Sequence, residues 1–134
     1  MSTRRRAPIG NVRRVHTHGS GTWGVMNNNV HETVQFESDQ EKILLLLFLR
    51  EPTIRRVVSQ PLKIPFIDEE GKSHSYIPDF LVFYRDERVE LHEVSVEKRR
   101  SEQAIQRREN AARLFCIEQG WTYVLHTEKT LPDR

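Results

Sequence analysis

The order of elements predicted in the second half of the chain is the feature that most constrains the fold. Residues 74–84 and 89–96 are rich in β-branched and aromatic residues, and the four charged residues between them indicate a tight turn. Residues 97–120 carry apolar side chains at helical spacing, and residues 121–127 follow as a short apolar segment. A strand that follows a helix in this way favours a parallel crossover into the same sheet. We therefore expect an α/β domain with a mixed central sheet flanked by helices.

The first half of the chain predicts a helix followed by a hairpin. Ser38 and Glu41 have the spacing of a capping box, in which the serine side chain accepts a hydrogen bond from the backbone of the first helical turn. Residues 43–49 are apolar on every face, so we expect this helix to be central and buried. Residues 54–66 and 74–84 read as the two strands of a hairpin, because acidic residues and a glycine typical of turns separate them.

The net charge of +2 hides an uneven distribution. Residues 1–30 carry five arginines and no acidic residue, which leaves 16 basic and 19 acidic residues in 31–134. We therefore divide the chain into a flexible basic arm, 1–29, and a single domain, 30–134. Such an arm is either a solubilising terminus or a segment that lies on nucleic acid phosphates.

Several classes of protein are excluded or disfavoured by composition. A chain of 134 residues can bury a hydrophobic core without disulfides or a structural metal. The single cysteine, Cys116, excludes a disulfide framework and a Cys-rich zinc site and fits a reducing cytoplasm. No apolar run approaches the ~20 residues that span a bilayer, the first residues lack the apolar core of a secretory signal, and no glycine-rich phosphate loop is present.

Two carboxylates in the predicted strands form a candidate metal site. Asp79 begins one strand and Glu93 lies in the next, so an antiparallel pairing permits them to meet near one end of the pair. Two carboxylates suit a hard divalent cation, which activates water and stabilises a leaving phosphate oxygen. Glu41 is a candidate third ligand. Glu41 is also explained by the capping box, and Asp79 by an ordinary position at a strand entry, whereas Glu93 lies in an apolar segment where a carboxylate needs a partner.

The ordered segments FESDQEKILLLLF, VVSQPLKI and YIPDFLVFYRDERVELHEVS resemble the PD-(D/E)xK nuclease superfamily. More narrowly, they resemble TnsA, the endonuclease subunit of heteromeric bacterial transposases. The resemblance runs from about residue 36 to residue 131. It implies a restriction-endonuclease-like fold and hydrolysis of DNA phosphodiester bonds with Mg²⁺, or with Mn²⁺ in its place. It also implies double-stranded DNA as substrate, with a DDE-type transposase subunit and an ATPase regulator as partners.

The resemblance assigns roles to the acidic residues and exposes one departure. Asp79 and Glu93 correspond to the two strand ligands of the metal, and Glu41 to the helix glutamate that helps to bind it. The family lysine that stabilises charge on the scissile phosphate is replaced by Ser95. Lys98 can supply the missing cation, the metal can carry the whole electrostatic load while Ser95 orients a water, or the site is inactive.

The basic residues and the resemblance together predict a DNA-binding surface. Its candidate residues are Arg4, Arg5, Arg6, Arg13, Arg14, Gln60, Arg99, Arg100, Arg107 and Arg108. On the predicted helix, the arginines are equally explained as a solvated face with paired charges. Two functions remain as alternatives to a transposition endonuclease: a DNA-binding or assembly subunit that keeps the fold without catalysis, and a stand-alone phage head-completion or repair nuclease.

Overall fold

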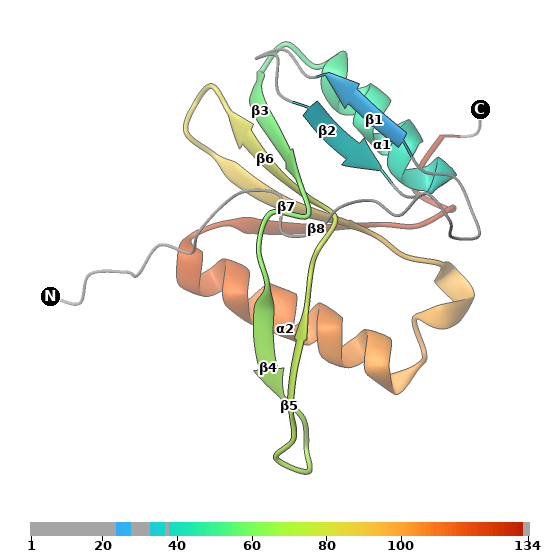
Figure 1. Ribbon diagram of the computed structural model, residues 1–134, viewed down its shortest axis with the longest axis vertical. Coiled ribbons are helices and arrows are strands. Elements are labelled where there is room, and N and C mark those ends of the chain that lie inside the picture. The colour runs from blue at the N-terminus through green and yellow to red at the C-terminus, as the bar shows by residue number, and fades with distance from the viewer. Residues whose placement is uncertain (1–23, 28–32, 37, 133–134) are drawn as a thin grey trace, which may run out of the picture.

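The computed structural model describes residues 24–27, 33–36 and 38–132 of the chain. Within them the elements follow one another in the order shown in Figure 1. They are β1 (Gly24–Asn27), β2 (Thr33–Phe36), α1 (Asp39–Leu49), β3 (Ile54–Ser59), β4 (Ile64–Ile67), β5 (Ser73–Tyr76), β6 (Phe80–Tyr84), β7 (Val89–Val94), the 3₁₀ turn η1 (Glu97–Arg99), α2 (Gln103–Gln119) and β8 (Thr122–His126). No helix in these ranges is long and apolar enough to cross a membrane.

A four-stranded mixed sheet forms the centre, in the order β3-β6-β7-β8. β6 pairs antiparallel with β3 and β7, whereas β7 and β8 run parallel and are joined by α2. The expected tight turn between residues 74–84 and 89–96 and the expected parallel crossover are therefore both confirmed. Figure 1 shows α1 on one side of this sheet and α2 on the other.

The hairpin predicted from 54–66 and 74–84 is divided into two structures. β3 pairs with β6 in the central sheet, whereas β4 and β5 form a separate hairpin that extends alongside α2 (Figure 1). The interruption has a local cause. Gln60 has a positive φ of 47°, and Pro61 and Pro78 lack the N–H that a continued ladder requires.

One strand lies inside the segment expected to be a flexible arm. β1 pairs antiparallel with β2 over four residues, so part of 1–29 has regular structure. The arginines predicted to bind DNA from this arm all lie outside the described residues; they are Arg4, Arg5, Arg6, Arg13 and Arg14.

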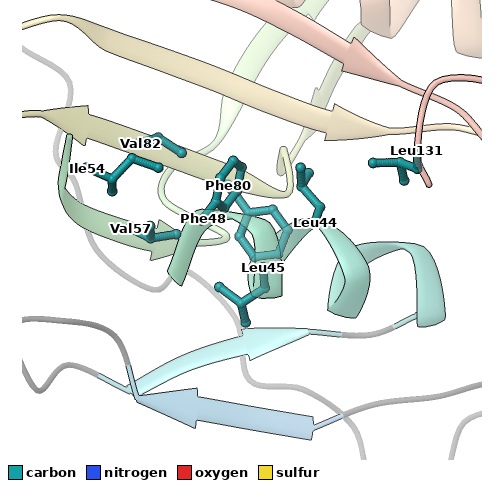
Figure 2. Packing of buried hydrophobic residues seen from close by; sticks show 8 residues of the cluster. All are labelled: Leu44, Leu45, Phe48, Ile54, Val57, Phe80, Val82 and Leu131. Atoms are coloured by element: carbon teal, nitrogen blue, oxygen red, sulfur yellow. The ribbon is translucent and has the colours of Figure 1, made fainter. Parts of the chain in front are cut away.

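Two hydrophobic clusters hold the helices to the sheet. On one face, Leu44, Leu45 and Phe48 of α1 pack against β3 and β6, and Figure 2 shows Phe48 beside Phe80. On the other face, Ala112 and Cys116 of α2 pack against the strands. The strand alternation explains this division, because Phe80 and Val82 face α1 while Leu81 and Leu91 belong to the α2 cluster. The complete α2 cluster of buried residues is Leu62, Ile64, Tyr76, Leu81, Leu91, Ala112 and Cys116.

Both helices differ in part from the sequence expectation. The Ser38 cap of α1 is confirmed, since its Oγ accepts a hydrogen bond from the Glu41 backbone at 3.1 Å. The expectation that the helix is buried on every face is wrong: Leu46 and Leu47 are 36% and 40% exposed, because α1 covers only one face of the sheet. The helix predicted over 97–120 is interrupted, since extended backbone at Glu102 separates η1 from α2.

A chain of hydrogen-bonded polar side chains lies on the sheet face opposite the α2 cluster. The Tyr84 hydroxyl donates to Glu90 at 2.6 Å, and His92 Nε2 lies 2.9 Å from the same carboxylate. His92 Nδ1 in turn lies 2.7 Å from Nε2 of His126, whose ring stacks on that of His92. Burial lowers the pKa of His126 to about 4, with a further contribution from His92, and burial also lowers the pKa of His92.

We expect this pair of histidines to make the protein less stable as the pH is lowered. An unfolded histidine takes up its proton near pH 6.5, so between pH 6.5 and pH 4 the unfolded chain binds more protons than the folded one. The free energy of unfolding therefore decreases as pH is lowered through this window. Because His126 is only partly buried, we expect its share at pH 5 to be on the order of 1 kcal/mol. Urea unfolding at pH 7 and pH 5 tests this with His126→Gln, which should lose less stability than the wild type; an identical loss in both chains would refute it.

Candidate active site

A cleft of about 370 Å³ opens at the end of β6 and β7, beside α2. Asp79 and Glu93 both line it. The last pair of the β6–β7 ladder joins Phe80 to His92, and the next residue on each side is Asp79 and Glu93, so both carboxylates lie at this end of the strand pair. The Val94 amide donates to Asp79 Oδ2 at 2.8 Å and so orients this carboxylate. The other lining residues are Lys63, Ser75, Tyr76, Ile77, Pro78, Val94, Ser95, Ile105, Arg108, Glu109 and Leu125.

Glu93 carries a charge that the described residues compensate poorly. Its Oε2 accepts a hydrogen bond from the Tyr123 hydroxyl at 3.3 Å, whereas the buried Oε1 has no hydrogen-bond partner in the described part of the chain. Burial raises the pKa of Glu93 to about 7, and Glu109 adds to this effect, although the Tyr76 and Tyr123 hydroxyls and Arg108 oppose it. A buried carboxylate at a cleft, with one oxygen that lacks a hydrogen-bond donor, is a suitable ligand for a cation.

The third carboxylate of the cleft is Glu109 rather than Glu41. Glu109 is 8% exposed and accepts two hydrogen bonds from Arg100, at 3.1 and 3.3 Å, so its charge is neutralised within α2 and the segment before it. The described residues contain no group of three or more His, Cys, Asp or Glu side chains arranged to hold a metal ion. The two other carboxylates that line the cleft are those of Asp79 and Glu93, and two carboxylates with water in the remaining positions suit a hard divalent cation.

The structure does not place Glu41 among the residues that line the cleft. Its Oε2 accepts a hydrogen bond from Ser38 Oγ at 3.1 Å. The reason is the placement of α1, which packs through Phe48 and its neighbours on the sheet face opposite α2. The structure therefore shows the capping contact of Glu41, and its role as a metal ligand stays a prediction.

Ser95 lies in the cleft, but the predicted substitute cation does not. The Ser95 amide donates to the His126 carbonyl at 2.8 Å, which extends the β7–β8 ladder and places Ser95 two residues beyond Glu93 on the same face. Lys98 belongs to η1 and is not among the residues that line the cleft. Two other cations are, Lys63 and Arg108. Sequence reasoning passed over Lys63, because nothing in its local pattern marks it, and treated Arg108 only as part of a basic helix.

Most arginines predicted to contact DNA from the last helix are held in ion pairs. Arg99 contacts Glu102, Arg107 contacts Glu69 of the β4–β5 turn, and Arg100 contacts Glu109. Their pairing favours the alternative of a solvated face with matched charges, although exposed pairs of this kind are weak.

Gln60, also predicted to contact DNA, is only 1% exposed, so its side chain is not presented to a ligand. Its backbone amide instead donates to the Asp79 carbonyl at 2.8 Å. Gln60 therefore helps to fix the chain at Asp79.

The fold and the cleft define a class of protein. A mixed sheet between helices, with two carboxylates at the end of adjacent strands, is consistent with a restriction-endonuclease-like α/β domain. The family model described as TnsA-like endonuclease N terminal matches residues 51–128. The chain therefore belongs to the TnsA-like endonuclease N-terminal family, a nuclease family whose substrate is DNA. A comparison with curated proteins found no significant match.

Proposed function

We propose that this chain is a metal-dependent DNA endonuclease and that the cleft beside α2 is its active site. The observation that carries the proposal is the pair of carboxylates that lines the cleft, Asp79 and Glu93, because Glu93 is buried there and its Oε1 has no hydrogen-bond partner among the described residues. An uncompensated carboxylate is costly to bury, and a divalent cation removes that cost. In a nuclease, a cation bound at these strand ends would activate the water that attacks the phosphodiester.

Each residue of the cleft would have a separate role in hydrolysis. Asp79 and Glu93 would hold Mg²⁺ or Mn²⁺, which supplies the positive charge that activates the attacking water and stabilises the departing oxygen. The Val94 amide keeps Asp79 in one orientation, and the Tyr123 hydroxyl does the same for Glu93. Ser95, on the same strand face as Glu93, is placed to hydrogen-bond a water or a phosphate oxygen in the cleft.

The pathway in which the nuclease acts rests on family membership alone. Cleavage at the end of a mobile element, together with a transposase subunit and an ATPase regulator, stays a prediction, as do a cytoplasmic location and the alternatives in phage head completion or repair. The replacement of the family lysine by Ser95 is the specific observation that favours a second candidate, a DNA-binding subunit without catalysis.

Nicking of supercoiled plasmid with Mg²⁺ or Mn²⁺ tests the endonuclease proposal. We expect the wild-type chain to relax the plasmid only when the metal is present, and Asp79→Ala to reduce cutting to the level seen with a chelator. Asp86→Ala is the matched control, because Asp86 lies in the exposed turn at the opposite end of the same strand pair and should leave cutting unchanged. If the wild type cuts no more than Asp79→Ala, the proposal is wrong and DNA binding without catalysis becomes the better candidate.

A further inference from the structure

Strand β7 and the Ser95 that follows it supply no cationic side chain to the cleft. Hydrolysis of a phosphodiester accumulates negative charge on the phosphate oxygens, and cationic groups aimed at that charge lower the barrier. Ser95 cannot provide it, and Lys98 does not line the cleft. Any compensating charge from the described residues has to come from the lining, where Lys63 and Arg108 are the only cationic side chains described.

Arg108 has the position and the freedom to act on a bound phosphate. It lies on α2 directly before Glu109, and its guanidinium lies 6.0 Å from the centre of the Tyr76 ring, itself part of the cleft. Arg108 lines the same cleft as the carboxylates of Asp79 and Glu93. The neighbouring Arg107 is engaged by Glu69, whereas Arg108 makes no ion pair or hydrogen bond with the described residues and is exposed.

Lys63 is the weaker of the two candidates. It is exposed and lines the cleft from the segment before β4, but no interaction joins it to Glu93 or to Tyr76 among the described contacts. An arginine also suits a phosphate better, since its planar guanidinium donates two parallel hydrogen bonds to two oxygens of the same group.

We infer that Arg108 contacts the scissile phosphate and supplies the positive charge that is missing at position 95, where the family lysine is replaced by serine. The inference rests on the proposed endonuclease function and adds a catalytic residue to it. In the reaction, the oxygen of a water molecule forms a bond to phosphorus and the bond from phosphorus to the leaving sugar oxygen breaks. The proton of the water passes to solvent, and the leaving oxygen takes up a proton. Arg108 stays protonated throughout and donates N–H groups to the non-bridging oxygens.

Single-turnover cleavage of a DNA duplex with saturating Mn²⁺ tests the inference. We expect Arg108→Ala to cut about 10²-fold more slowly, as for the removal of one donor to a developing oxyanion, and Arg108→Lys to retain part of the rate. Arg50→Ala is the matched control, because Arg50 is an exposed arginine at the end of α1 on the other face of the sheet and should cut like the wild type. Thermal unfolding of each variant reports whether the fold is kept.

A rescue distinguishes a catalytic charge from a structural one. Adding Ser95→Lys to Arg108→Ala returns a cation to the cleft from the neighbouring strand, and we expect cleavage to recover at least tenfold. A merely structural role for Arg108 would not respond to a lysine at that position.

The outcomes separate this inference from the proposal on which it rests. If wild-type and Arg108→Ala chains cut equally well, or if Lys98→Ala or Lys63→Ala is impaired while Arg108→Ala is not, the inference is overturned and the endonuclease proposal stands. If the wild type does not cut, both are overturned. A slow Arg108→Ala chain that Ser95→Lys restores supports both.

Discussion

Glu93→Gln is expected to abolish DNA cleavage while making the metal-free protein more stable. Glutamine keeps the shape of the side chain and its hydrogen bond from Tyr123, but it removes the charge whose buried Oε1 has no partner among the described residues. Removal of an uncompensated buried charge should raise the free energy of unfolding by about 1–3 kcal/mol. The same change deprives the metal of one of its two carboxylates. We expect the rate of cleavage to fall about 10³-fold or more, at the upper end of what the removal of one charge-stabilising group costs.

Thermal unfolding with and without Mn²⁺, together with plasmid nicking, measures both effects. The wild type should gain thermal stability from the metal, since a ligand that binds only the folded chain stabilises it, and Glu93→Gln should lose most of that gain. Glu90→Gln is the matched control three residues earlier on β7. Glu90 faces the other side of the sheet and accepts hydrogen bonds from Tyr84 and His92, so its variant should cut normally and lose about 1 kcal/mol of stability. A metal-free Glu93→Gln chain less stable than the wild type would contradict the account of an uncompensated charge.

Among the substitutions predicted here, Phe80→Ala is expected to lower the free energy of unfolding the most. Phe80 is completely buried and meets the Phe48 ring edge-on, with centroids 5.8 Å apart, at the contact between α1 and the central sheet (Figure 2). Truncation removes the ring and leaves a cavity, which typically costs about 3–5 kcal/mol. Because domains of this kind are stable by only about 5–15 kcal/mol, a substantial unfolded fraction is expected at moderate temperature.

Urea unfolding followed by circular dichroism measures the loss at Phe80. Phe83→Ala provides the comparison on the same strand, because Phe83 is only partly buried and lies beneath the Arg55 and Arg56 guanidinium groups; we expect it to lose less than half as much. Phe80 also follows Asp79 directly, so the less damaging Phe80→Leu tests whether looser packing alone slows cleavage. A cost below 1 kcal/mol for Phe80→Ala would show that α1 does not depend on this contact.

The elements predicted correctly are those whose signals are local. The Ser38 cap and the turn between β6 and β7 each depend on a few adjacent residues, and the structure has both. The crossover from β7 through α2 to β8 was also predictable, because connection rules leave few alternatives once strand, helix and strand follow one another. The predictions fail where the sequence pattern of one element continues but the backbone conformation changes. This happens at Gln60, which has a positive φ, and at Glu102, which is extended.

For the candidate site, the sequence alone determined the two strand carboxylates and the absence of a lysine at position 95, since both follow from residue identity and strand order. Only the tertiary structure decided which other side chains share their cleft. It places α2 over them, which brings in Arg108 and Glu109, and it places α1 on the opposite face, which leaves Glu41 at its cap. The physical reason is that the face on which a helix packs depends on apolar contacts summed over the whole sheet. No spacing between charged residues along the chain carries that information.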